Sequence, residues 1–135
     1  MNALPFESLD YLYLPAPDID ASVTFYTTVL GGELLWKIHD ASTWVAAVRL
    51  AADGPAVVLA DHLAPGRGLL IYRVRDLADS QRTLVDRGWS AESESVELPQ
   101  GPCRVFRDPA GHRLAIYERV RPGMDERFAG RFDDQ

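Results

Sequence analysis

The same helix start occurs twice in this chain, and strand-like segments flank both copies in the same order. The two copies read Asp18-Ile19-x-x-Ser22 and Asp76-Leu77-x-x-Ser80. Aspartate is a favoured N-cap, because its carboxylate accepts a hydrogen bond from a free backbone amide of the first helical turn. A motif that repeats together with its flanking pattern predicts two copies of one supersecondary unit.

Apolar residues at spacings of three and four predict an amphipathic helix after each start. The first helix is expected within DIDASVTFYTTVLGG (18–32) and the second within DLADSQRTLVDRG (76–88). Gly31 with Gly32 is expected to end the first helix and Gly88 the second, because glycine readily adopts the left-handed conformation that follows many helices.

One strand-like segment precedes each helix and three follow it. Around the first helix these are LDYLYLP (9–15), ELLWKI (33–38), STWVAAVRL (42–50) and PAVVLAD (55–61). Around the second they are GLLIYRV (68–74), SAESESVEL (90–98), PCRVF (102–106) and HRLAIYE (112–118). The sequence therefore predicts an α+β fold of two tandem βαβββ modules. We expect a single domain over 1–135, with module one at about 8–62, module two at about 68–119 and a tail at 120–135.

Three motifs carry a resemblance to a known family. They are LDYLYLPAPDIDASVTFYTTVLGGEL, GLLIYRVRDLADS and VFRDPAGHRLAIYE. They resemble the vicinal oxygen chelate superfamily, which includes glyoxalase I, bleomycin resistance proteins and extradiol dioxygenases. The resemblance implies that the two modules form a cup-shaped, barrel-like mixed sheet with the helices outside. It also implies a homodimer, which is common among these proteins.

Metal-using members of this superfamily hold the metal with side chains from four strands that face the cup. The resemblance puts those positions at Tyr11, Leu59, Leu69 and Ala115. Transition metals bind imidazole, carboxylate or thiolate groups in proteins. Leucine and alanine cannot coordinate a metal, and a neutral tyrosine is a poor ligand. We therefore expect no metal and no cofactor, and no residue is assigned a catalytic role.

Strand alternation groups aromatic, apolar and arginine side chains on faces that the resemblance would turn into the cup. The predicted ligand-binding residues are Tyr11, Tyr13, Leu59, Leu69, Ile71, Arg73, Arg113, Ala115 and Tyr117. Such a lining suits a small organic molecule. The alternative is an ordinary core with arginines at its mouth. Phase alone does not fix the faces of Trp36 and Trp44.

Other chemically reactive side chains have no motif around them. His39, His62 and His112 are expected in exposed turns and strand ends, and Cys103 in the core. Glu118 is out of phase with Ala115, so it should face the other side of its strand or the sheet edge.

Charge and composition narrow the range of partners. The net charge of −6 disfavours binding to nucleic acid, whose phosphates are also negative. No apolar segment approaches the ~20 residues of a membrane helix, so no membrane contact is expected. A single cysteine and the absence of a signal-peptide pattern favour a cytoplasmic location.

The leading functional hypothesis is a metal-free protein of the glyoxalase/bleomycin resistance type that binds a small organic molecule and sequesters a drug or a metabolite. The first alternative is a lyase, isomerase or dioxygenase with a non-standard active site. The second is a structural or regulatory paralogue whose cup is filled by side chains. In the tail, Met124, Phe128 and Phe132 recur at intervals of four, which fits either a short clamping helix or a frayed end.

Overall fold

The computed structural model describes residues 4–40, 42–64, 66–88, 91–98, 100–121 and 128–133, and only the backbone of residues 91–97. The first half contains β1 (Ser8–Pro15), α1 (Ile19–Thr24), the π-helical turn η1 (Phe25–Val29), β2 (Glu33–Asp40), β3 (Thr43–Arg49) and β4 (Ala56–Ala60). The second half contains β5 (Leu69–Val74), α2 (Leu77–Asp86), β6 (Ala91–Leu98), β7 (Gly101–Arg107) and β8 (Arg113–Glu118). The α+β class and the tandem βαβββ order are confirmed.

The chain divides into two compact units, and each unit takes in one terminus from the other half of the sequence. The first-module unit consists of Tyr11–Gly68 with Asp125–Gln135. The second-module unit consists of Met1–Asp10 with Leu69–Met124. The start of the chain therefore belongs with module two and its end with module one. The cup that the resemblance implies for the pair of modules stays a prediction.

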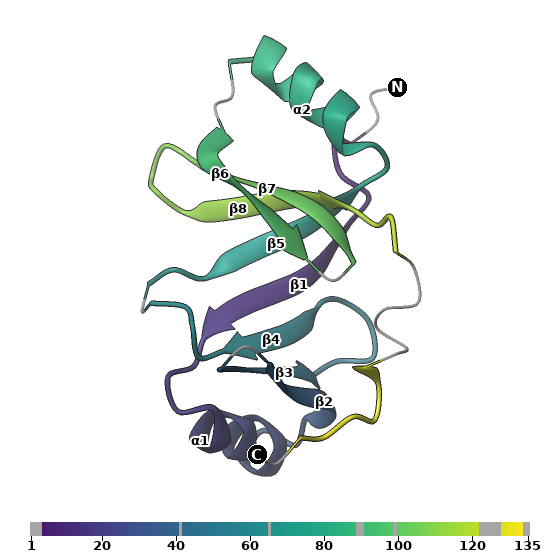
Figure 1. The fold of residues 1–135 in the computed structure, drawn as a ribbon. Coiled ribbons are helices and arrows are strands. Elements are labelled where there is room, and N and C mark those ends of the chain that lie inside the picture. The colour runs from purple at the N-terminus through teal and green to yellow at the C-terminus, as the bar shows by residue number, and fades with distance from the viewer. Residues whose placement is uncertain are drawn as a thin grey trace. The chain divides into compact units, whose positions relative to one another are not determined.

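In the first-module unit the strand order is β2-β3-β4-β1. Strands β1 and β4 are parallel, and the other neighbours are antiparallel. Helix α1 lies on one face of these strands (Figure 1). Its Ile19 packs there on a buried apolar cluster. The other buried members of that cluster are Ala16, Ala46, Val48, Val57 and Leu59.

The first helix begins as predicted but is shorter than its apolar pattern. Asp18 caps it, accepting a hydrogen bond from the amide of Ala21 at 3.1 Å. After the six residues of α1 the helix changes to the wider π-helical turn η1, in which the Leu30 amide donates to the Phe25 carbonyl at 3.0 Å. The Thr27 hydroxyl donates to the Val23 carbonyl at 2.7 Å, and such a bond competes with the regular helical one.

In the second-module unit the strand order is β5-β8-β7-β6, with β5 and β8 parallel. Helix α2 lies on one face of this sheet (Figure 1), where Leu77 packs on Val74 and Ile116. Asp76 caps the helix as predicted, accepting from the Asp79 amide at 2.9 Å. The carboxylate of Glu118 accepts the Leu77 amide at 2.9 Å, so this residue faces the helix, as its phase predicted.

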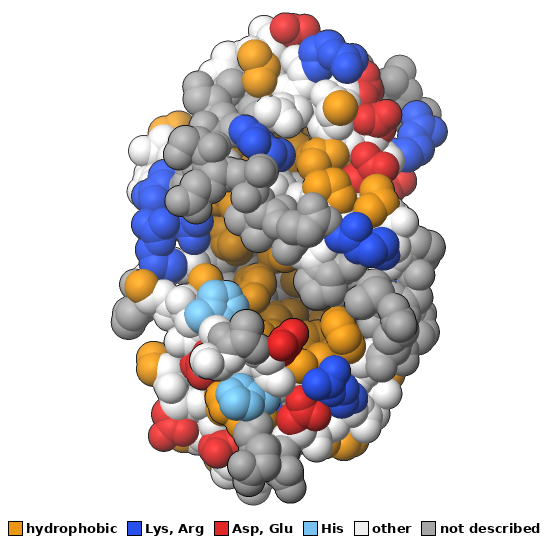
Figure 2. All heavy atoms as spheres, in the orientation of Figure 1, with side chains coloured by type: hydrophobic (Ala, Val, Ile, Leu, Met, Phe, Trp, Pro, Cys, Tyr) orange, Lys and Arg blue, Asp and Glu red, His pale blue; other side chains and the backbone are white. Residues whose placement is uncertain are grey.

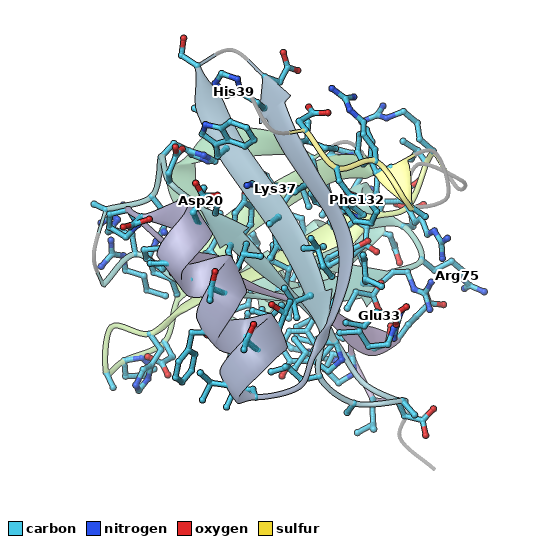
Figure 3. All side chains as sticks on the ribbon, turned by 90° about the horizontal axis from the view of Figure 1, so that it is seen from below. Asp20, Glu33, Lys37, His39, Arg75 and Phe132 are labelled. Carbon is cyan, nitrogen blue, oxygen red and sulfur yellow. The ribbon has the colours of Figure 1, made fainter. Side chains whose placement is uncertain are left out.

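The described part of the tail runs along the edge of β2. The Lys37 amide bonds the Arg131 carbonyl at 2.8 Å, and the Asp133 amide bonds the Lys37 carbonyl at 2.7 Å. Phe132 lies beside β2 in Figure 3. Covering an edge strand removes a surface that would otherwise pair with another chain. The tail segment 128–133 is thus docked rather than frayed, whereas Met124 and Trp89 lie outside the described residues.

Candidate ligand-binding site

Two predicted site residues of β1 share the face of their sheet that is turned away from α1. Tyr11 pairs with Ala56 and Tyr13 with Val58, and partners in a parallel pair point the same way. The prediction from the sequence that Leu59 lies on the same face is wrong. Leu59 pairs with Leu14 and packs in the core beneath α1. The segment AVVLA is apolar throughout, so no alternation in it could reveal which residue faces which side.

A hollow of about 200 Å³ opens on the Tyr11 face of the first-module unit. Its lining comes from β1 to β4 and from the tail segment. The lining residues are Tyr11, Leu35, Trp36, Ala47, Arg49, Ala56 and Ala129. Figure 2 shows hydrophobic side chains in a recess over β1 and β4. We refer to this feature as the module-one hollow.

Local sequence explains the shape of the hollow. The register of β2 against β3 shifts between Leu34 and Trp36, as in a β-bulge. A bulge places an additional residue opposite one partner, and here both Leu35 and Trp36 reach the hollow. Ala47 and Ala56 stand on the neighbouring strands, and their small side chains leave the space that larger residues would fill.

Two aromatic side chains form the apolar walls. Tyr11 and Trp36 are 9% and 8% exposed, and the Trp36 ring packs on Phe128 of the tail segment with 5.5 Å between centroids. The docked tail therefore holds the indole in place. Trp44 lies on the opposite face of β3, where its ring stacks on His39 at 4.3 Å. His39 thus belongs to β2 rather than to an exposed turn.

Lys37 completes the group around Trp44 on the α1 side of the sheet. Its ammonium lies 4.9 Å from the Trp44 ring centroid and 2.5 Å from a carboxylate oxygen of Asp20. In Figure 3, Lys37 of β2 and Asp20 of α1 lie close together. These contacts join the helix to the sheet and leave the module-one hollow to the other face.

Tyr13 belongs to the Tyr11 face but does not line the hollow. Its ring meets the imidazole of His62 edge-on, with 6.1 Å between centroids. Burial raises the pKa of Tyr13 above the usual phenol value, which keeps its hydroxyl neutral. This tyrosine can therefore donate a hydrogen bond but is not a base at neutral pH.

The remaining predicted residues gather in the second-module unit, on the face opposite α2. Ile71 pairs with Ala115 and Arg73 with Tyr117, so β5 and β8 present these side chains together. Ile71, Ala115 and Tyr117 are at most 1% exposed. Leu69 is buried as well, and Arg113 is half-buried at the start of β8. This face is packed, and only its arginines keep appreciable exposed surface.

A polar cluster ends this packed face. The Tyr117 hydroxyl donates to Asp10 at 2.5 Å, and the Asp10 carboxylate also accepts from Ser8 at 2.5 Å. The Nε of Arg73 lies 3.7 Å from Asp10 and 3.5 Å from Glu7, within ion-pair distance but outside hydrogen-bond geometry. The predicted site residue Tyr117 thus has a structural partner at the start of β1.

A protein-family model for the glyoxalase/bleomycin resistance protein/dioxygenase superfamily matches residues 8–116. The chain belongs to this superfamily. No curated protein sequence matches it. Among solved structures, methylmalonyl-CoA epimerase from Mycobacterium tuberculosis is similar with a TM-score of 0.72 and 15% identity, over 89% of this chain and 93% of that one.

Two further members of the superfamily illustrate the range of similar structures. Methylmalonyl-CoA epimerase from Streptomyces coelicolor, solved with 2-nitronate-propionyl-CoA, gives a TM-score of 0.66 at 14% identity, over 85% of this chain and 99% of that one. A superfamily member from Vibrio splendidus gives 0.55 at 18% identity, over 82% and 97%. At these identities the likeness concerns the fold.

The donor groups of this superfamily member do not fit the transition metal that many members use. Of the four positions aligned with metal ligands, Leu69 and Ala115 have no donor atom, and Leu59 faces the α1 core. No three histidine, cysteine or carboxylate side chains gather into a ligand set within the described ranges. His112, for example, is bound through Nδ1 to Asp108 at 2.8 Å. The metal-free state nevertheless stays a prediction.

Several residues that line the hollow were not predicted from the sequence of this superfamily member. Ala47 and Arg49 lie two residues apart in STWVAAVRL, and this spacing could have placed them on the same face of the strand. Linking them to Tyr11 needs the pairing of β3 with β4 and of β4 with β1, which no local pattern encodes. Trp36 follows a bulge, whose extra residue interrupts the alternation of side chains, so counting residues does not give the correct face.

Proposed function

We propose that this protein binds a small organic molecule in the module-one hollow and sequesters it without a bound metal, in the cytoplasm. The observation that carries the proposal is the hollow itself, with aromatic walls at Tyr11 and Trp36 and one cation at Arg49. Concave, mostly apolar sites with a few polar groups are the usual form of small-molecule sites. None of the described helices could span a membrane.

A structural neighbour supports the general class of function. The Streptomyces coelicolor epimerase was solved with a small-molecule ligand, 2-nitronate-propionyl-CoA, on a similar fold. A fold of this kind hosts many activities, so that ligand is not assigned to this chain. Cys103, the free thiol of the chain, is buried in β7, which suits a reducing compartment.

The predicted ligand-binding residues of module two do not line the module-one hollow. Leu69, Ile71 and Ala115 are packed against neighbours and leave little room for a ligand. Arg73 and Arg113 keep exposed surface on the second-module unit, and a contact of these two arginines with a ligand stays a prediction. The enzyme alternative requires conversion of the bound compound into a new product, whereas sequestration leaves the compound unchanged.

The placement of the tryptophans provides a direct test. Trp44→Phe with Trp89→Phe leaves Trp36, in the hollow, as the sole tryptophan. We expect a compound selected by a thermal-shift screen to change the emission of this variant in a saturable way. The matched reporter carries Trp36→Phe and Trp89→Phe and keeps Trp44, which lies on the other face. Its emission should stay constant.

A blocking substitution shows whether the hollow is the site. Ala56→Phe places a ring in the space beside Tyr11, and we expect it to abolish binding. Ala52→Phe puts the same ring on an exposed bend and should leave binding unchanged. Equal affinity of both variants for the compound would show that it binds elsewhere. Analysis of the recovered compound by mass spectrometry then separates sequestration from turnover.

A further inference from the structure

We infer that the module-one hollow selects a compact organic anion, a carboxylate carried on a flat apolar body, and that the guanidinium of Arg49 recognises the negative charge. This inference rests on the proposed function and adds the chemical class of the ligand. Two observations support it: the positive charge and partial burial of Arg49, and the volume of the hollow.

Arg49 is the one charged residue among the described residues that line the hollow. It is half-buried at the end of β3, and it forms no ion pair or hydrogen bond through its side chain within the described part of the chain. A partly desolvated guanidinium is stabilised by a carboxylate, which it can bind through two parallel hydrogen bonds. The chain carries a net charge of −6, which repels anions at long range. Any preference for an anion must therefore come from this local cation.

Glu33 is a candidate to neutralise Arg49, because the two residues are register partners across β2 and β3. Their charged groups are not within ion-pair distance, and Glu33 is exposed and does not line the hollow. Figure 3 shows Glu33 at the opposite end of β2 from His39. Glu33 therefore lowers the positive potential at Arg49 without occupying its hydrogen-bond donors.

The volume limits the size of the ligand body. The hollow has a volume of about 200 Å³. Sites for drug-sized ligands usually measure about 300–1,000 Å³. The walls at Tyr11 and Trp36 are flat rings, and alanines stand between them. A compact planar body fits this space, and a large drug does not.

Three isosteric probes that differ only in charge test the inference: benzoate, benzamide and the benzamidinium cation. Their affinities are measured by titration of the variant that keeps Trp36 as sole tryptophan. We expect benzoate to bind about tenfold or more tightly than benzamide, because the bond to Arg49 is charge-assisted. Benzamidinium should bind more weakly than benzamide.

Substitutions in the same background identify the source of the preference. Arg49→Gln should bring benzoate and benzamide to equal affinity, and Arg49→Lys should restore part of the difference. Glu33→Gln should tighten benzoate binding a few-fold by removing a nearby negative charge. Arg67→Gln, at an exposed arginine of the same unit that does not line the hollow, should change nothing.

The possible failures are distinguishable. Equal binding of the three probes, or tighter binding of the neutral or cationic one, overturns the anion inference but leaves a small-molecule site when Ala56→Phe blocks that binding. A preference for benzoate that survives Arg49→Gln contradicts the role of Arg49. Benzoate binding that Ala56→Phe does not affect contradicts both the inference and the proposed site. Absence of any response to benzoate up to millimolar concentration overturns the inference alone, since the compound screen tests the proposed function separately.

Discussion

The hydroxyl of Tyr117 donates a hydrogen bond to the carboxylate of Asp10 at a distance of 2.5 Å. This bond ties the start of β1 to the last strand, 107 positions further along the sequence. Tyr117 is 1% exposed, so the bond lies in a poorly solvated environment in which an unsatisfied group is costly. Both residues belong to the second-module unit, which includes the beginning of the chain.

Removing that hydroxyl should destabilise the protein. Tyr117→Phe leaves the Asp10 carboxylate without one of its donors, and hydrogen bonds to a charged group contribute about 1.5–3 kcal/mol. We expect a loss of about 2 kcal/mol in the free energy of unfolding, measured by urea titration. Tyr72→Phe is the matched control, because that hydroxyl has no hydrogen bond among the residues described. Equal stability of the two variants would contradict this account of Tyr117.

The thiol of Cys103 should be unreactive in the folded protein. Burial raises its pKa to about 12, and the thiolate is the reactive form. Labelling with a thiol reagent at pH 8 should be slow in buffer and fast in concentrated urea. Since the folded state keeps a proton that the unfolded state releases above its lower pKa, stability should fall as the pH rises from about 8.5 toward 12. Fast labelling of the folded protein would be inconsistent with this environment.

Chelation should not alter thermal stability. The aligned positions Leu69 and Ala115 have no metal-donor atoms, so no free energy of metal binding is linked to folding. We expect the melting temperature to be the same with and without EDTA, and metal analysis to find less than one transition-metal ion per chain. A tightly held, equimolar metal would instead favour the lyase, isomerase or dioxygenase alternative.

The expected homodimer has a candidate surface around the end of the first helix. Val29 and Leu30 are 66% and 51% exposed, and Phe25 and Leu50 are also exposed. Clustered apolar side chains of this kind are usually covered by another protein surface. Light scattering should therefore give twice the 15.0 kDa mass of one chain. Val29→Arg should shift the mass toward the monomer, and a monomeric wild type at micromolar concentration would refute the expectation.

The parts of the fold that short segments determine could be predicted from the sequence. Asp18 and Asp76 cap their helices because each carboxylate bonds an amide only three residues away. The strands also follow local patterns, and their order gave the tandem βαβββ arrangement. The first helix is the exception, because its apolar pattern runs on through η1 while its hydrogen bonds change to the π type.

The candidate site was harder to predict from the sequence, because it depends on pairing between strands that are distant along the chain. Tyr11 was predicted, but Leu59 was placed on its face and lies on the other. Arg49 and Trp36 reach the hollow through the register of β2 against β3 and of β3 against β4. Pairings of this kind are set by packing of whole strands, and an insertion of one residue, as at the bulge in β2, reverses the faces.

Chemical-shift mapping tests most directly the central claim, that a small molecule binds in the module-one hollow. The measurement is a titration of isotopically labelled protein with the compound that gives the largest thermal shift. The account predicts saturable shifts at the Trp36 indole and the amides of Tyr11, Ala47 and Ala56, with no change at the Trp44 indole. Shifts confined to the α2 surface, or a response at Trp44 without one at Trp36, would contradict it.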